Sequence, residues 1–100
     1  MKRRRVRITA DAETDLNAIY DWVSSATGRA VAIAYVRRIR RFCFGFDLAA
    51  ARGAPRHDLL PGLRIVGFER RITIAFTIDD DTVTFLRFFY GGQDWEDAFE

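Results

Sequence analysis

The fold is decided by the stretch Leu63–Tyr90, LRIVGFERRITIAFTIDDDTVTFLRFFY. Apolar and polar residues alternate along most of it, and alternation with a period of two is typical of strands that bury one face. Two short polar interruptions, at Glu69–Arg70 and at Asp79–Asp81, divide the stretch in the manner of hairpin turns. The predicted strands are 63–68, 71–78 and 82–90. Because the last of them is apolar on both faces, it is predicted to lie in the centre of a sheet.

The alternation within the last strand also assigns its side chains to faces. It places Val83, Phe85, Arg87 and Phe89 on one face, and Leu86, Phe88 and Tyr90 on the other. Arg87 then stands among apolar neighbours, where a guanidinium is expensive to bury without a partner. The candidates for that partner within the chain are Asp94 and Glu96.

Two amphipathic helices are predicted upstream of these strands, at 11–26 and 29–46. Apolar residues recur at i, i+3, i+4 and i+7 from Leu16 in the first helix, which gives it one apolar face. The second helix carries a longer apolar stripe that includes Cys43, with arginines on the other side. Since little more than Thr27–Gly28 separates the helices, they are expected to form an antiparallel hairpin with facing stripes.

The remaining segments complete one domain over residues 1–100. A period-two pattern predicts a further strand at 4–9. Residues 47–62 contain two prolines and two glycines without sustained periodicity, and they predict a loop with a short helical extension through Leu48–Ala51. Residues 91–100 are an acidic tail. The order β-α-α-β-β-β indicates the α+β class, in two layers, with the helical hairpin packed on an antiparallel sheet.

Composition limits the classes of function. One hundred residues, 49% of them apolar, suit a single hydrophobic core, and no apolar run approaches the length of about 20 residues that crosses a bilayer. The basic start, Met1–Arg5, is followed by Val6–Ile8 in place of the apolar region of a signal peptide, which favours a cytoplasmic protein. Cys43 is the only cysteine, which excludes an internal disulfide and a paired-cysteine metal cluster. We expect no metal and no cofactor.

The net charge of +2 conceals an uneven distribution. Residues 1–78 hold 15 Lys and Arg against 7 Asp and Glu, whereas residues 79–100 hold 1 against 7. A basic body of this kind attracts nucleic acid or an acidic protein through its summed field, and the count of charges leaves both partners open.

Three segments, in their order and spacing, carry a family resemblance. The first is ADAETDLNAIY at Ala10–Tyr20, the second is PGLR at Pro61–Arg64, and the third is FYGGQDW at Phe89–Trp95. Together they resemble the toxins of the ParE/RelE superfamily, and its ParE branch more closely, over nearly the whole chain. Many relatives carry arginines where this chain has Gly92–Gln93, so a function that depends on a basic tail is not carried over.

The resemblance implies a two-layer ParE/RelE-like fold and the role of toxin in a type II toxin–antitoxin pair. ParE-like toxins are understood to inhibit DNA gyrase stoichiometrically, without catalytic residues, and plasmid stabilization is a role of such pairs. The implied partner is a ParD-like antitoxin, whose acidic, amphipathic C-terminal segment wraps the toxin in a hetero-oligomer. Neither sequence-specific nucleic-acid binding by the toxin nor a membrane role is implied.

Two other functions stay open on the sequence. RelE-like relatives are ribosome-dependent mRNA endoribonucleases, and their arginines and terminal aromatic residue resemble Arg64, Arg87 and Tyr90 of this chain. These three residues would be the catalytic set of a ribonuclease, although a general base for such chemistry is missing. The third function is that of a degenerate antitoxin-binding module without toxicity.

Each candidate residue also has a structural interpretation. Arg64 and Arg87 suit ion pairs with the tail, with the loop or with the antitoxin. The run Arg37–Arg41 is typical of the solvated side of an amphipathic helix, and contact with DNA in a gyrase complex is its alternative. His57 is expected to be a solvated loop residue and Cys43 a core residue. The candidates for antitoxin binding or another functional surface are Arg64, Arg87, Tyr90, Arg37 and Arg41.

Overall fold

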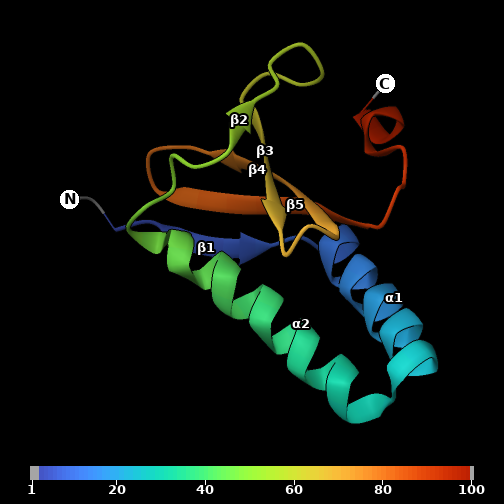
Figure 1. Cartoon of the computed structure of the whole chain (residues 1–100). Coiled ribbons are helices and arrows are strands. Elements are labelled where there is room, and N and C mark those ends of the chain that lie inside the picture. Colours follow the sequence, from blue (N-terminus) through green and yellow to red (C-terminus); the bar gives the residue numbers. More distant parts are fainter. Residues whose placement is uncertain (1–2, 100) are drawn as a thin grey trace.

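The computed structural model describes residues 3–99, in which two helices cover one face of a five-stranded sheet (Figure 1). Its elements are β1 (Arg5–Ile8), α1 (Ala10–Thr27), α2 (Arg29–Phe44), η1 (Gly45–Asp47), β2 (Ala54–Pro55), β3 (Leu63–Phe68), β4 (Ile72–Ile78), β5 (Thr82–Tyr90) and η2 (Trp95–Phe99), where η denotes a 3-10 helix. The predicted α+β class is confirmed. Both helices and the four longer strands begin and end within two residues of their predicted bounds.

The two helices form the predicted hairpin because the chain reverses at Gly28. α1 begins after its cap residue, Thr9, whose side chain accepts a hydrogen bond from the backbone N–H of Ala12. Gly28 ends the helix with a φ of 102°, in the region that favours glycine. The buried side chains of the two helices include Leu16, Ile19, Ile39 and Cys43. They place the main core between the hairpin and the sheet.

The strands follow the order β1-β5-β4-β3-β2 across the sheet. β5 therefore lies between β1 and β4, in the interior position predicted for it. The strands from β2 to β5 pair antiparallel, as expected. β1 instead pairs with β5 in parallel, from Arg5 opposite Thr82 to Ile8 opposite Phe85. The sheet is mixed, and the expected antiparallel arrangement does not extend to β1, because a period-two pattern indicates the buried face of a strand but not its direction.

A β-bulge at Leu86 changes the predicted faces of β5. Phe85 lies opposite Phe76 and Arg87 lies opposite Ala75, so Leu86 is the extra residue. Beyond the bulge the alternation is shifted by one position. The residues of β5 that pack toward the helices are Val83, Phe85, Phe88 and Tyr90, and those that pack on the other face are Leu86 and Phe89. Grouping Arg87 with Val83 and Phe85 is therefore wrong.

The segment 47–62 is mostly irregular, as predicted, but it contains the short strand β2, which the sequence pattern does not indicate. β2 can approach β3 because residue 53 is a glycine with a φ of 70°. A Cβ at this position would collide with the backbone carbonyl oxygen of Ile65. The helical extension predicted at Leu48–Ala51 is not found at these residues, and the helical turn after α2 is η1 instead.

Residues 91–99 of the acidic tail fold onto the face of the sheet that the helices leave uncovered (Figure 1). There it covers a second, smaller core, formed by Leu63, Ala75 and Phe89 with the partly buried Trp95 and Phe99 of η2. Arg56 holds the tail in place, since its Nη2 lies 2.7 Å from a carboxylate oxygen of Glu96 and its guanidinium lies over the ring of Trp95. The tail is therefore a structural part of the domain.

Candidate functional site

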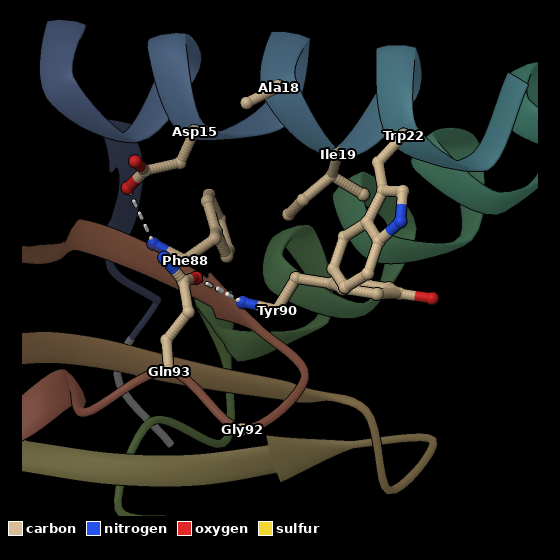
Figure 2. Close-up of a pocket in the computed structure, with 8 residues that line it drawn as sticks. All are labelled: Asp15, Ala18, Ile19, Trp22, Phe88, Tyr90, Gly92 and Gln93. Atoms are coloured by element: carbon tan, nitrogen blue, oxygen red, sulfur yellow. Dashed lines mark hydrogen bonds between the residues drawn. The ribbon is translucent and has the colours of Figure 1, made fainter. Parts of the chain in front are cut away.

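A groove of about 330 Å³ lies between α1 and the end of β5 (Figure 2). It exists because β1 pairs with β5 only as far as Phe85, which leaves the last residues of β5 to face α1 across an open edge. The residues that line the groove are Asp15, Ala18, Ile19, Trp22, Phe88, Tyr90, Gly92 and Gln93. We refer to it below as the α1–β5 groove.

Two side chains occupy the place of a neighbouring strand along this edge (Figure 2). The carboxylate of Asp15 accepts a hydrogen bond of 2.9 Å from the backbone N–H of Phe88, and the side-chain oxygen of Gln93 accepts one of 2.9 Å from that of Tyr90. Unpaired N–H groups on a strand edge invite another strand. Because these two are satisfied within the chain, the groove offers a side-chain surface to a partner at these positions.

Arg87 has its partner on α1 and not in the tail. Its Nε lies 2.7 Å from Oδ2 of Asp15 and its Nη2 lies 3.1 Å from Oδ1, which makes a bidentate ion pair. The Asp15 side chain is 15% exposed and that of Arg87 35%, and their hydrogen bonding raises the pKa of Arg87 above its ordinary value. The partners suggested by the sequence, Asp94 and Glu96, are therefore corrected to Asp15. Arg87 lies beyond the last residue of β5 that pairs with β1, so its side chain can reach α1 at the open edge of the sheet.

Arg64 holds the loop that precedes its own strand. Its Nε donates a hydrogen bond of 2.8 Å to the carbonyl oxygen of Arg52, and its Nη2 donates one of 3.3 Å to that of Gly53. The residue thus secures the segment that leads into β2, and its guanidinium is engaged by backbone groups of the chain itself.

The three residues of the ribonuclease interpretation are not brought together. Arg64 lies opposite Phe76, which faces the helices, and Arg87 lies opposite Ala75, which faces the other way. Residues paired across neighbouring strands share a face, so the two guanidinium groups start from opposite sides of the sheet. Tyr90 packs against aromatic rings of α1 and α2. Each residue has a separate environment.

Two arginines of α2 are bound within the chain. Arg38 pairs with Glu69 through two hydrogen bonds of 2.9 Å, and Arg40 pairs with Glu13 through hydrogen bonds of 3.0 and 2.6 Å. The hydrogen bonds lower the pKa of each carboxyl and raise the pKa of each guanidinium. These two arginines tie α2 to α1 and to the turn between β3 and β4.

Arg37 and Arg41 differ from their neighbours. Both are exposed on α2, one turn apart, and within residues 3–99 neither side chain makes an ion pair. Two cations that the fold does not use are available to a partner of opposite charge.

The other potentially reactive side chains have structural environments. Nδ1 of His57 accepts a hydrogen bond of 3.2 Å from the backbone N–H of Gly62 in an exposed loop. Cys43 is fully buried, and burial raises the pKa of its thiol to about 12, which disfavours the reactive thiolate. Within residues 3–99, no three His, Cys, Asp or Glu side chains form a group that could hold a metal ion. No helix in that range has the length and apolarity to span a membrane.

Sequence reasoning missed the residues that shape the groove. Trp22 lies beside the apolar stripe of α1, is 53% exposed and meets the ring of Tyr90 edge to face. Its place just outside the stripe is the signal that could have identified it, because an exposed tryptophan on a helix often marks a binding surface. The pairing of Asp15 with Arg87 has no comparable local signal, since the residues are 72 positions apart.

Known proteins share both the sequence pattern and the fold. Residues 6–95 match the family described as the ParE toxin of the type II toxin–antitoxin system parDE. Among solved structures, the chain is similar to one from the chromosomal ParDE system of P. aeruginosa, with a TM-score of 0.76 and 27% identity over 88% of this chain and 96% of that one. It also has the fold of a chain in the toxin–antitoxin complex RelBE2 from Mycobacterium tuberculosis, with a TM-score of 0.67 and 21% identity over 93% and 97% of the two chains. No curated protein sequence gives a significant match. Because the family match spans most of the chain, this protein belongs to the ParE toxin family and is a toxin of the type II toxin–antitoxin class.

Proposed function

We propose that this toxin inhibits DNA gyrase as a stoichiometric poison and is neutralised by a ParD-like antitoxin. The family match and the 27% identity to a chain of the P. aeruginosa ParDE system support the ParE branch. The likeness to the RelBE2 complex, at 21% identity, concerns the fold alone. With gyrase as its target, the toxin acts in the cytoplasm, and the pair contributes to plasmid stabilization.

The observation that carries this proposal is the separation of Arg64, Arg87 and Tyr90. Cleavage of RNA through its 2′-hydroxyl needs a base, an acid and a cation that converge within about 3 Å of the reacting atoms. In this chain Arg87 is bound to a carboxylate of α1, Arg64 is bound to loop carbonyl groups, and the ring of Tyr90 packs against the helices. This dispersal supports a toxin that acts by binding its target rather than by cleaving RNA.

The first test is growth on inducible expression, with and without co-expression of the cognate ParD-like antitoxin. We expect growth arrest that the antitoxin relieves. Normal growth at full expression of the folded toxin would contradict toxicity and favour the degenerate antitoxin-binding module.

The target is tested with purified toxin that has been freed of its antitoxin. Supercoiling by purified DNA gyrase is scored for inhibition and for trapped cleaved DNA, beside an mRNA cleavage assay on translating ribosomes. We expect trapped cleavage complexes with intact message. Cut message with unaffected gyrase would overturn the proposal and make Arg64, Arg87 and Tyr90 the catalytic candidates. Tyr90→Phe serves as the matched variant in both assays, because it keeps the ring packing and removes only the hydroxyl that a ribonuclease would use.

A further inference from the structure

The hydroxyl of Tyr35 is not explained by the fold. The side chain lies in α2, is 7% exposed, and packs against the rings of Phe68 and Tyr90, contacts that a phenylalanine would also make. Within residues 3–99, its Oη is the only buried side-chain nitrogen or oxygen without a hydrogen-bond partner. A buried hydroxyl in this state is destabilising. It needs a partner that the described chain does not supply.

Tyr35 lines a hollow of about 280 Å³ next to the α1–β5 groove, which we name the Tyr35 hollow. Its lining residues are Trp22, Val23, Ala26, Thr27, Val31, Tyr35, Arg71 and Tyr90. Trp22 and Val31 are 53% and 50% exposed, large fractions for apolar side chains. Trp22 and Tyr90 also line the α1–β5 groove, where Figure 2 shows them in contact. Hollow and groove therefore join into one apolar surface near the bend of the helical hairpin.

The polar groups of the hollow favour an acceptor with negative charge. Burial is the main cause that raises the pKa of Tyr35 above its ordinary value, so its hydroxyl keeps a hydrogen to donate. Arg71 is exposed, and its guanidinium makes no ion pair within the described range. Its backbone is fixed, because its carbonyl oxygen accepts a hydrogen bond of 2.8 Å from Gly91. Glu69, the carboxylate that acts on Tyr35, is already bound by Arg38.

We propose that the Tyr35 hollow receives an Asp or Glu side chain of the antitoxin. The carboxylate accepts hydrogen bonds from Oη of Tyr35 and from the guanidinium of Arg71, while apolar side chains of the same segment pack on Trp22 and Val31. Because the Arg71 side chain is exposed and lines the hollow, it can reorient to bind the carboxylate.

This assignment rests on the proposed function, since it takes the antitoxin as the occupant. Charge complementarity selects that occupant: two hydrogen-bond donors, one of them a cation, stand beside an exposed apolar wall and fit a segment that is both acidic and amphipathic. The phosphates of a nucleic acid would match the donors but would leave Trp22 and Val31 uncovered.

Tyr35→Phe is the first variant to test, because it removes the hydroxyl and keeps the ring. The free variant should be at least as stable to heat as the wild type, since an unpaired buried group is lost. Its affinity for the cognate ParD-like antitoxin, measured by titration calorimetry, should fall roughly 10- to 100-fold, the effect of losing a hydrogen bond to a charged group. Tyr20→Phe removes a hydroxyl that does not line the hollow and should leave the affinity unchanged.

Arg71→Gln tests the second donor. Its affinity for the same protein should fall about two- to fivefold, as expected for loss of a partly exposed ion pair. Arg70→Gln is the matched control, because Arg70 is exposed in the same turn but does not line the hollow. If Tyr35→Phe and Arg71→Gln both bind like the wild type, the proposal is overturned.

A second experiment identifies which Asp or Glu residue of the antitoxin binds in the Tyr35 hollow. Overlapping peptides of the cognate antitoxin are compared with versions that carry single Asp→Asn or Glu→Gln changes. One change should weaken binding to wild-type toxin and have no further effect on Tyr35→Phe, because interacting pairs are non-additive. If no change couples to Tyr35, the hollow does not hold a carboxylate.

The gyrase assay and the binding measurements test the proposed target and the proposed antitoxin site separately. Unaffected gyrase would overturn the proposed target and leave the binding results as they stand. A wild-type toxin that does not bind the ParD-like antitoxin would overturn the antitoxin partner and the site together.

Discussion

Asp15 joins a helix to a strand edge through a single carboxylate. It accepts two hydrogen bonds from the guanidinium of Arg87 and one from the backbone N–H of Phe88. The carboxylate thus binds the guanidinium of Arg87 and also occupies the edge of β5 that β1 leaves open. It also closes one end of the α1–β5 groove, so the shape of the groove depends on this residue.

We predict that Asp15→Ala lowers the free energy of unfolding by about 2–3 kcal/mol. Hydrogen bonds to a mostly buried charge are lost, and Arg87 is left without its partner. The measurement is urea unfolding followed by circular dichroism. Glu13→Ala, which breaks the more exposed pair with Arg40, is the control and should cost less than about 1 kcal/mol. Equal losses in the two variants would show that Asp15 has no special role.

The pair of Glu13 with Arg40 predicts a dependence of stability on acid pH. The hydrogen bond from Arg40 lowers the pKa of Glu13 below its ordinary value of 4.5. The pair therefore contributes its stability above about pH 4.5 and loses it as the pH falls through the lower pKa of the folded state. Glu13→Gln should lack this part of the acid decline in unfolding free energy. Because the side chains are 37% and 43% exposed, the effect should stay below about 1 kcal/mol. Parallel pH profiles for the two proteins would contradict the assignment.

At the scale of elements, the two-residue strand β2 depends on one glycine. Gly53 brings the chain close to β3, where the carbonyl oxygen of Ile65 leaves no room for a Cβ. The carbonyl oxygen of Gly53 accepts a hydrogen bond from Arg64 of β3. The close contact between Gly53 and β3 thus positions both β2 and the loop that precedes it.

We predict that Gly53→Ala destabilises the protein by about 3 kcal/mol or more. The added methyl group meets backbone atoms that cannot move aside, and alanine is also strained at a φ of 70°. Gly62→Ala is the matched control, because Gly62 has a φ of 81° but open space around it, and it should cost about 1–2 kcal/mol. Thermal unfolding measures both variants, and similar losses would remove the steric argument.

Elements formed by local interactions could be predicted from the sequence, whereas those that depend on contacts between distant segments could not. The helices and the main strands are encoded by local periodicity, as the stripe from Leu16 and the alternation of β4 illustrate. The bulge at Leu86, the strand β2 and the parallel pairing of β1 depend on where distant parts of the chain come to rest. The candidate site divides in the same way. Sequence reasoning identified Arg64 and Arg87 as residues that need partners, but it could not identify those partners.

At the scale of the whole molecule, some charged side chains of residues 3–99 are paired within the chain and others in that range are exposed without an ion pair. The acidic tail turns back on the domain, where Glu96 pairs with Arg56, and the arginines of α2 are partly neutralised by α1 and by the turn after β3. Arg37 and Arg41 keep their charge exposed on one side of the domain. An acidic antitoxin would be attracted to that side before it makes close contact.

We predict that association with the antitoxin slows by roughly tenfold or more when the salt concentration rises from low to high, because screening weakens the attraction of exposed charges. The double variant Arg37→Gln and Arg41→Gln should associate more slowly at low salt, with a weaker dependence on salt and an unchanged dissociation rate. Arg38→Gln, whose native charge is already paired, is the control. Stopped-flow fluorescence of Trp22 and Trp95 measures the rates, and an association rate independent of salt would contradict the prediction.

The pairing of β1 with β5 also bears on the order in which the strands assemble during folding. Thr9, just after β1, bonds to Leu86, 77 residues further along the chain, whereas β3, β4 and β5 are joined by short turns. Closing a long loop costs more conformational entropy than closing a short one, and this entropy is lost before the distant contact can compensate for it. We therefore predict that β3, β4 and β5 pair before β1 joins the edge of β5. Until β1 joins, the N–H and C=O groups on that edge of β5 are open to water.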